Sequence, residues 1–77
     1  MTSEHTYKVI ELVGSSPDGV EKAIENAISR ASETLQNLDW FEVKEIRGNI
    51  SGGKVGWYQV KLGVGFRVLD PTELGRD

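Results

Sequence analysis

The chain has 77 residues, a net charge of −3, one histidine and no cysteine. This length allows one small domain, residues 1–77, and the composition excludes disulfides, thiolate metal sites and histidine-cluster metal sites. No block of like charge indicates a segment that binds nucleic acid, and no apolar run is long enough to cross a membrane. We therefore expect a cytoplasmic protein that binds neither nucleic acid nor a membrane. Because disulfides and these metal sites are excluded, a partner subunit is the remaining route to extra buried surface.

The first predicted strand covers residues 6–13, which are rich in β-branched and aromatic types, and it ends at Gly14. Its apolar residues fall on both faces, so neither face is expected to be fully in water. The ordered part of the chain is expected to span about residues 6–69, with polar tails at both ends.

A helix is predicted from about Pro17 to Asn37. Ser16 is a suitable N-cap, and Pro17 suits the first helical position. Apolar residues recur at the i, i+4, i+7 spacing of one helix face. They are Val20, Ile24, Ala27, Ile28, Ala31, Leu35 and Leu38.

The second predicted strand covers residues 38–48 and is followed by the turn NISGGK. Because side chains alternate along a strand, Phe41 and Val43 are predicted on the core face and Trp40 on the other. The same alternation places Glu42 and Glu45 on opposite faces, which argues against an acid/base pair of carboxylates.

The third predicted strand, residues 55–69, is long enough to span about 45 Å and must therefore curve. Gly63 and Gly65 are expected sites for the bend. One face is expected to be the core face, with Tyr58, Val60, Leu62, Val64, Phe66 and Val68. A single helix covers one face of three strands, so the other face, with Trp57 and Gln59, is left uncovered.

Trp40 is therefore the most informative residue, and its pattern leaves three interpretations. It is an out-of-phase core residue, an inter-subunit packing residue, or a stacking platform for a planar ligand. Gln59, Arg47 and Arg67 are by default surface residues. Their functional alternatives are an amide that reads the polar edge of a heterocycle and guanidinium groups that bind phosphate.

Catalytic motifs are poorly supported. The only histidine, His5, lies in the polar start of the chain, so there is no Ser-His-Asp set. The loop GSSPDG before the helix matches neither phosphate-binding fingerprint. We do not expect an enzyme.

Three segments carry a family resemblance: YKVIELVGSSPDGVEKAIENAISRASETL, LDWFEVKEIRG and YQVKLGVGFRV. In this order and spacing the chain resembles the dodecins, small flavin-binding proteins, over nearly all of residues 7–69. The resemblance implies an α+β fold, β-α-β-β, with a three-stranded antiparallel sheet wrapped around one helix. It also implies a hollow homododecamer in which paired flavins stack between tryptophans.

Carried onto this chain, the resemblance makes Trp40 the stacking residue and Gln59 the reader of the flavin's polar edge. Arg47 and Arg67 match arginines of the bacterial branch, which favours FMN over riboflavin or FAD, with coenzyme A as a further candidate ligand. The implied role is flavin storage, sequestration and quenching. The alternatives are an oligomer without flavin, a binder of another nucleotide-like ligand such as coenzyme A, and a flavoenzyme.

Overall fold

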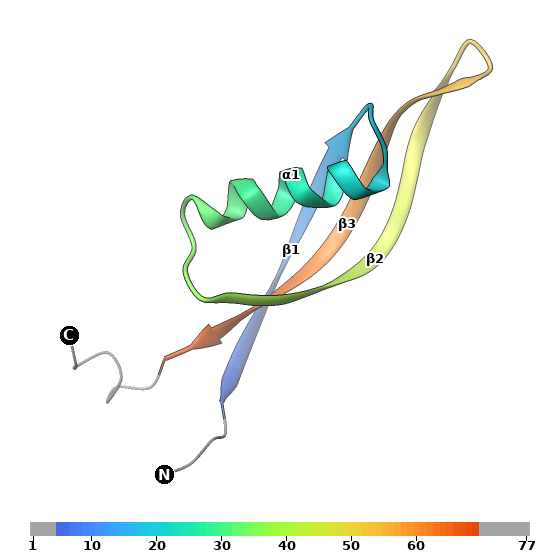
Figure 1. The fold of residues 1–77 in the computed structure, drawn as a ribbon. Helices are drawn as coiled ribbons and strands as arrows, with labels where there is room; N and C mark the ends of the chain where they lie inside the picture. Colours follow the sequence, from blue (N-terminus) through green and yellow to red (C-terminus); the bar gives the residue numbers. More distant parts are fainter. Residues whose placement is uncertain (1–4, 70–77) are drawn as a thin grey trace.

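The computed structural model describes residues 5–69 (Figure 1). Strand β1 (Thr6–Ser16) is followed by helix α1 (Val20–Ser32) and by the strands β2 (Leu38–Ser51) and β3 (Lys54–Val68). The strands form one antiparallel sheet in the order β1-β3-β2. This confirms the predicted β-α-β-β fold with a three-stranded sheet and one helix. The predicted polar tails lie largely outside the described residues.

The core lies between α1 and one face of the sheet, mainly over β1 and β3. Val60, Leu62 and Val64 of β3 are almost completely buried there, as the strand pattern predicted. They pack with Ala23 and Ala27 of α1. The predicted helix face omitted Ala23, yet the alanines form its most buried line. Small side chains there allow the helix to lie close to the sheet.

Helix and sheet approach each other closely at Gly14 in β1. A Cβ atom on this residue would lie 2.1 Å from the Ala23 carbonyl oxygen and 2.8 Å from Ala27 Cβ. Only glycine fits between the two backbones, so Gly14 fixes how deeply α1 packs on β1.

The start of α1 differs from the prediction. Ser16 is the last residue of β1, buried, and its Oγ accepts a hydrogen bond from the Asp18 backbone N–H at 3.0 Å. The N-cap is Gly19, with φ of 143°, and it makes no side-chain cap. The predicted Ser16 cap and Pro17 start are therefore wrong, because the serine hydroxyl closes a local turn before the helix.

The end of α1 is also earlier than predicted. The helix ends at Ser32, and the Leu35 backbone N–H donates to the Ala31 carbonyl at 2.9 Å in one further turn. Asn37 has φ of 65°, a left-handed conformation that redirects the chain into β2. The apolar spacing continued past Ser32 because Leu38 reaches the same core from the start of β2.

The β2–β3 hairpin is longer than predicted, since its turn contains only Gly52 and Gly53. Their φ angles are 60° and 77°, as a two-residue hairpin turn requires, and Ser51 pairs with Lys54 across it. The hairpin continues well past α1, as the yellow and orange tip of the ribbon shows (Figure 1). We call this projecting part, residues 49–57, which extend past the end of β1, the hairpin arm.

Strand β2 lies outside the cover of α1, which crosses the sheet over β1 and β3. Phe41 and Val43 pair with the buried Val64 and Leu62, so they share the face that carries the helix. Nevertheless Phe41 is 48% exposed and Val43 is 42% exposed. Their predicted place in the core is therefore wrong for the single chain, although their predicted face is right.

Candidate ligand-binding face of the sheet

The sheet face that points away from α1 carries all four predicted site residues. We call it the open face and define it by alternate β3 residues together with their partners in β1 and β2. The β3 residues are Trp57, Gln59, Lys61, Gly63, Gly65 and Arg67. Because no other described element packs on this face, its side chains are available to a ligand or to another subunit.

Two bulges in β2 decide which of its residues reach the open face. Leu38 pairs with Phe66, but Trp40 pairs with Gly65, so Asp39 is an extra residue. This shift lets Leu38 enter the core while Trp40 turns to the open face.

The second bulge is at Lys44, between Val43, which pairs with Leu62, and Glu45, which pairs with Lys61. It turns Glu45 and Arg47 to the open face; unbroken alternation from Trp40 would have turned them away. Glu42 pairs with Gly63, so Glu42 and Glu45 share one face and their predicted opposition is wrong.

Trp40 lies directly over Gly65 of the neighbouring strand. A Cβ atom on Gly65 would lie 2.3 Å from both Cε2 and Cζ2 of the indole. The side chain remains 41% exposed, and its only described aromatic neighbour is Tyr7, at 6.1 Å between ring centroids and 48° between planes. The indole thus rests on the sheet, has a tyrosine beside it and leaves surface for a further ring.

Tyr7 is itself held by the bulge residue Asp39. Its hydroxyl donates a hydrogen bond to Asp39 Oδ2 at 2.9 Å. This hydrogen bond, followed by slight desolvation and the carboxylate charge, raises the pKa of Tyr7 above its ordinary value, while Arg67 opposes the shift. The phenol therefore stays a neutral donor at physiological pH.

Arg67 lies at the same end of the open face as Trp40. It pairs with Tyr7 across β1, and its Nη1 is 3.4 Å from His5 Nδ1. We call this part of the sheet the aromatic end of the open face. It contains Trp40, Tyr7, Asp39, Gly65 and Arg67.

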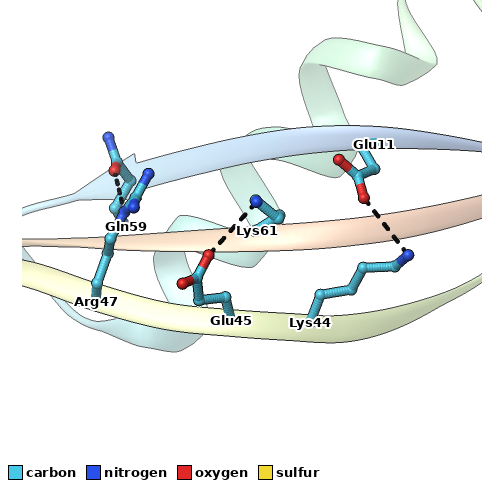
Figure 2. Close-up of polar contacts among 6 residues, drawn as sticks. All are labelled: Glu11, Lys44, Glu45, Arg47, Gln59 and Lys61. Atoms are coloured by element: carbon cyan, nitrogen blue, oxygen red, sulfur yellow. Dashed lines mark hydrogen bonds and ion pairs between the residues drawn. The ribbon is translucent and has the colours of Figure 1, made fainter.

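Gln59 and Arg47 lie together farther along the sheet, beside the hairpin arm. Arg47 Nε donates to Gln59 Oε1 at 3.0 Å, as the close-up shows (Figure 2). This contact uses the amide oxygen and leaves the two N–H donors for acceptor oxygens of a ligand. The remaining guanidinium donors of Arg47 suit an anion.

Two ion pairs follow Arg47 and Gln59 along the sheet, as Figure 2 shows. Lys44 Nζ is 3.5 Å from Glu11 Oε2, and Lys61 Nζ is 3.5 Å from Glu45 Oε1. All four side chains are substantially exposed, so each pair contributes little to stability. The two pairs, together with Glu42 opposite Gly63, make the middle of the open face charged, between its aromatic end and its amide–guanidinium end.

One chain does not bring the four predicted residues together. Trp40 is level with Gly65 and Arg47 is level with Gln59, six positions along β3. Six extended residues span about 20 Å, which separates Trp40 and Arg67 from Arg47 and Gln59. One chain therefore presents these two groups well apart on the open face.

Sequence reasoning missed Tyr7, Asp39 and Gly65 as neighbours of Trp40. The signal that could have found Gly65 is a glycine in phase with the open-face residues of β3. Tyr7 and Asp39 gave no signal, because their positions depend on register and on a bulge. Within residues 5–69 the structure shows no group of three acidic, histidine or cysteine side chains that could hold a metal. It shows no helix there that could cross a membrane.

Comparison with known proteins identifies the family. The dodecin family profile matches residues 6–69. Dodecin from Thermus thermophilus is 60% identical over 62 residues, which cover 80% of this chain and 90% of that protein.

Solved structures agree with this match. The dodecin structure from Streptomyces coelicolor has a TM-score of 0.83 at 55% identity, covering 90% of this chain and 99% of that one. Calcium dodecin from Mycobacterium tuberculosis, solved with a novel calcium-binding site, has a TM-score of 0.72 at 29% identity, covering 86% and 94%. The chain belongs to the dodecin family.

Proposed function

We propose that this protein stores and sequesters flavin, with FMN as the first ligand and riboflavin or FAD as alternatives. The observation that carries the proposal is the Trp40 indole, which lies on the open face of the sheet with surface left for a planar ring. Membership of the dodecin family supports it.

The proposed role needs a stacking partner rather than catalysis. An electron-rich indole in face contact with isoalloxazine would transfer an electron to the excited ring, and the return of this electron to the indole would leave both rings in the ground state. No acid or base takes part. The protein would therefore protect and buffer flavin, as a binding protein and not as an enzyme.

We propose that the complete site forms between subunits of a homododecamer. The separation of about 20 Å along β3 supports this proposal, because a ring stacked on Trp40 would reach the Gln59 amide of a partner subunit more readily than that of its own chain. Exposed apolar side chains on β2 and the hairpin arm, including Ile46, Ile50 and Val55, support such an assembly.

The arginines suit different parts of a phosphorylated flavin. Arg67 lies at the aromatic end of the open face, which supports a role in binding a phosphate beside a ring stacked on Trp40. Arg47 accompanies Gln59, whose N–H donors suit the carbonyl oxygens of the flavin edge. The same aromatic and cationic chemistry fits a nucleotide such as coenzyme A, which is the alternative ligand.

The test is a fluorescence titration of FMN with flavin-free protein, after a sizing column has established the oligomer. We expect near-complete quenching that saturates at about one flavin per chain, because each chain contributes one stacking indole. Trp40→Ala should keep the particle and weaken binding by about 1–3 kcal/mol, the usual value of one stacked ring.

Trp57→Phe is the matched control, since it changes the other tryptophan without touching Trp40. It should leave quenching intact. A full-size particle that does not change FMN fluorescence would contradict the proposal. In that case the exposed arm would favour the second candidate, an assembly without flavin, for which Trp40→Ala should break the particle.

A further inference from the structure

Gly65 and Trp40 share an unusually close contact. A Cβ atom on Gly65 would lie 2.3 Å from Cε2, 2.3 Å from Cζ2 and 2.7 Å from Cη2 of the indole. Carbon atoms in contact are normally about 3.5–4.0 Å apart. The indole therefore fills the space that any larger side chain at position 65 would need.

These three distances also fix the orientation of the ring. A point in the ring plane, outside the Cε2–Cζ2 bond, would be much farther from Cη2 than from the other two atoms. The nearly equal distances instead place the absent methyl above the ring. One face of the six-membered ring thus covers Gly65, and the opposite face points away from the sheet.

Gly65 does not have a positive φ angle that would itself require glycine. Glycines with positive φ are Gly19, Gly52 and Gly53 among residues 5–69, and Gly65 is not one of them. Other residues can adopt the conformation of Gly65, so the described contact that demands glycine is the indole. The two positions also face each other in the strand register.

We infer that Gly65 is a positioning residue that sets the plane of the Trp40 indole and its height above the sheet. Through the indole, Gly65 sets how much space a planar ligand has above the ring. Tyr7 adds a border, since its ring centroid is 6.1 Å from that of Trp40. A methyl group at position 65 would force the ring away from β3 and into the space for the ligand. This inference rests on the proposed flavin function.

The test compares Gly65→Ala with Gly63→Ala, both in a Trp57→Phe background so that only Trp40 emits. Gly63 is the matched control because its added methyl would meet the flexible end of Lys44, at 2.9 Å from Cε. The first measurement is collisional quenching of Trp40 by acrylamide in flavin-free protein. The second is FMN affinity by titration.

We expect Gly65→Ala to make Trp40 more accessible to acrylamide and to weaken FMN binding by about tenfold, which corresponds to about 1.4 kcal/mol. Gly63→Ala should leave both values within about twofold of the parent. Unchanged accessibility after Gly65→Ala, or unchanged affinity despite a moved indole, would overturn the inference.

Two further outcomes are separable. If the parent protein does not bind FMN, the proposed function fails, and the accessibility measurement still decides whether Gly65 holds the indole. If Gly65→Ala does not assemble, Gly65→Ala combined with Trp40→Ala removes the clash. Restored assembly would support the inference. Failure of this double variant, where Trp40→Ala alone assembles, would overturn it.

Discussion

Tyr7 is the residue whose protonation reports on the aromatic end of the open face. Its hydroxyl donates to Asp39, and this hydrogen bond raises the pKa of Tyr7 above 10.0. A raised pKa in the folded state means that the protonated form is favoured there. The associated stability is present below pH 10 and is lost as the pH rises through the folded pKa.

We expect Tyr7 to ionise at higher pH than an unperturbed tyrosine. The measurement is tyrosinate absorbance in a Tyr58→Phe background, which leaves Tyr7 as the remaining tyrosine. Asp39→Asn should move the titration back toward the ordinary value, because it removes the negative charge and the strongest acceptor. An identical titration in the two proteins would contradict the described hydrogen bond.

At the scale of the elements, the contact between α1 and β1 depends on Gly14. Gly14→Ala would place a methyl 2.1 Å from the Ala23 carbonyl oxygen, which belongs to a rigid helix backbone. We expect the free energy of unfolding to fall by about 1–3 kcal/mol, as for other overpacked cores. Urea unfolding at one fixed protein concentration measures it.

Gly63→Ala serves again as the comparison, because it adds the same methyl against a flexible side chain on the open face. Its unfolding midpoint should stay close to that of the parent. A Gly14→Ala protein with the parent's midpoint would show that α1 can move away from β1 at little cost.

The sequence predicted element types well and element ends poorly. Alternation in β3 and the helical spacing from Val20 to Ala31 each reflect burial over several residues, so both patterns were strong. The helix start was misplaced because Ser16 offered a cap that the structure uses for a turn instead.

Bulges explain most of what pattern could not predict about the site. An extra residue at Asp39 and another at Lys44 each change the phase of β2, and neither carries a local sequence signal. Simple alternation correctly placed Trp40 on the opposite face of the sheet from Phe41. It would have separated Arg47 from Trp40, and the common face of these two residues depends on the second bulge.

At the scale of the whole molecule, apolar residues outside the cover of α1 are the main feature. Ile46 is on the helix-bearing face of β2, before the hairpin arm, pairs with the buried Val60 and is 54% exposed. Between Phe41 and α1, an open groove of about 610 Å³ is lined by Ile24 and Ile28. Exposed apolar surfaces of this kind are typical of contacts with other chains and of ligand grooves, and they support the proposed assembly.

We expect Ile46→Asp to shift the protein from the large particle to smaller species. The substitution removes about 1.5–3 kcal/mol of apolar burial per buried side chain and adds a charge that needs water. Analytical ultracentrifugation measures the size. Ser51→Asp adds the same charge at an exposed polar position of the arm and should leave the particle intact. A full-size Ile46→Asp particle would show that this part of β2 stays in water.

The projecting hairpin arm has a consequence for how the stability of this protein is defined. Its apolar side chains gain little from their own chain, so in the proposed homododecamer much of the favourable free energy of the native state would come from association. Mass action would then enter the unfolding equilibrium, and we expect the melting temperature to rise with protein concentration. Dilution would act on the proposed assembly as a denaturant does, and a free energy of unfolding for one chain would not describe it.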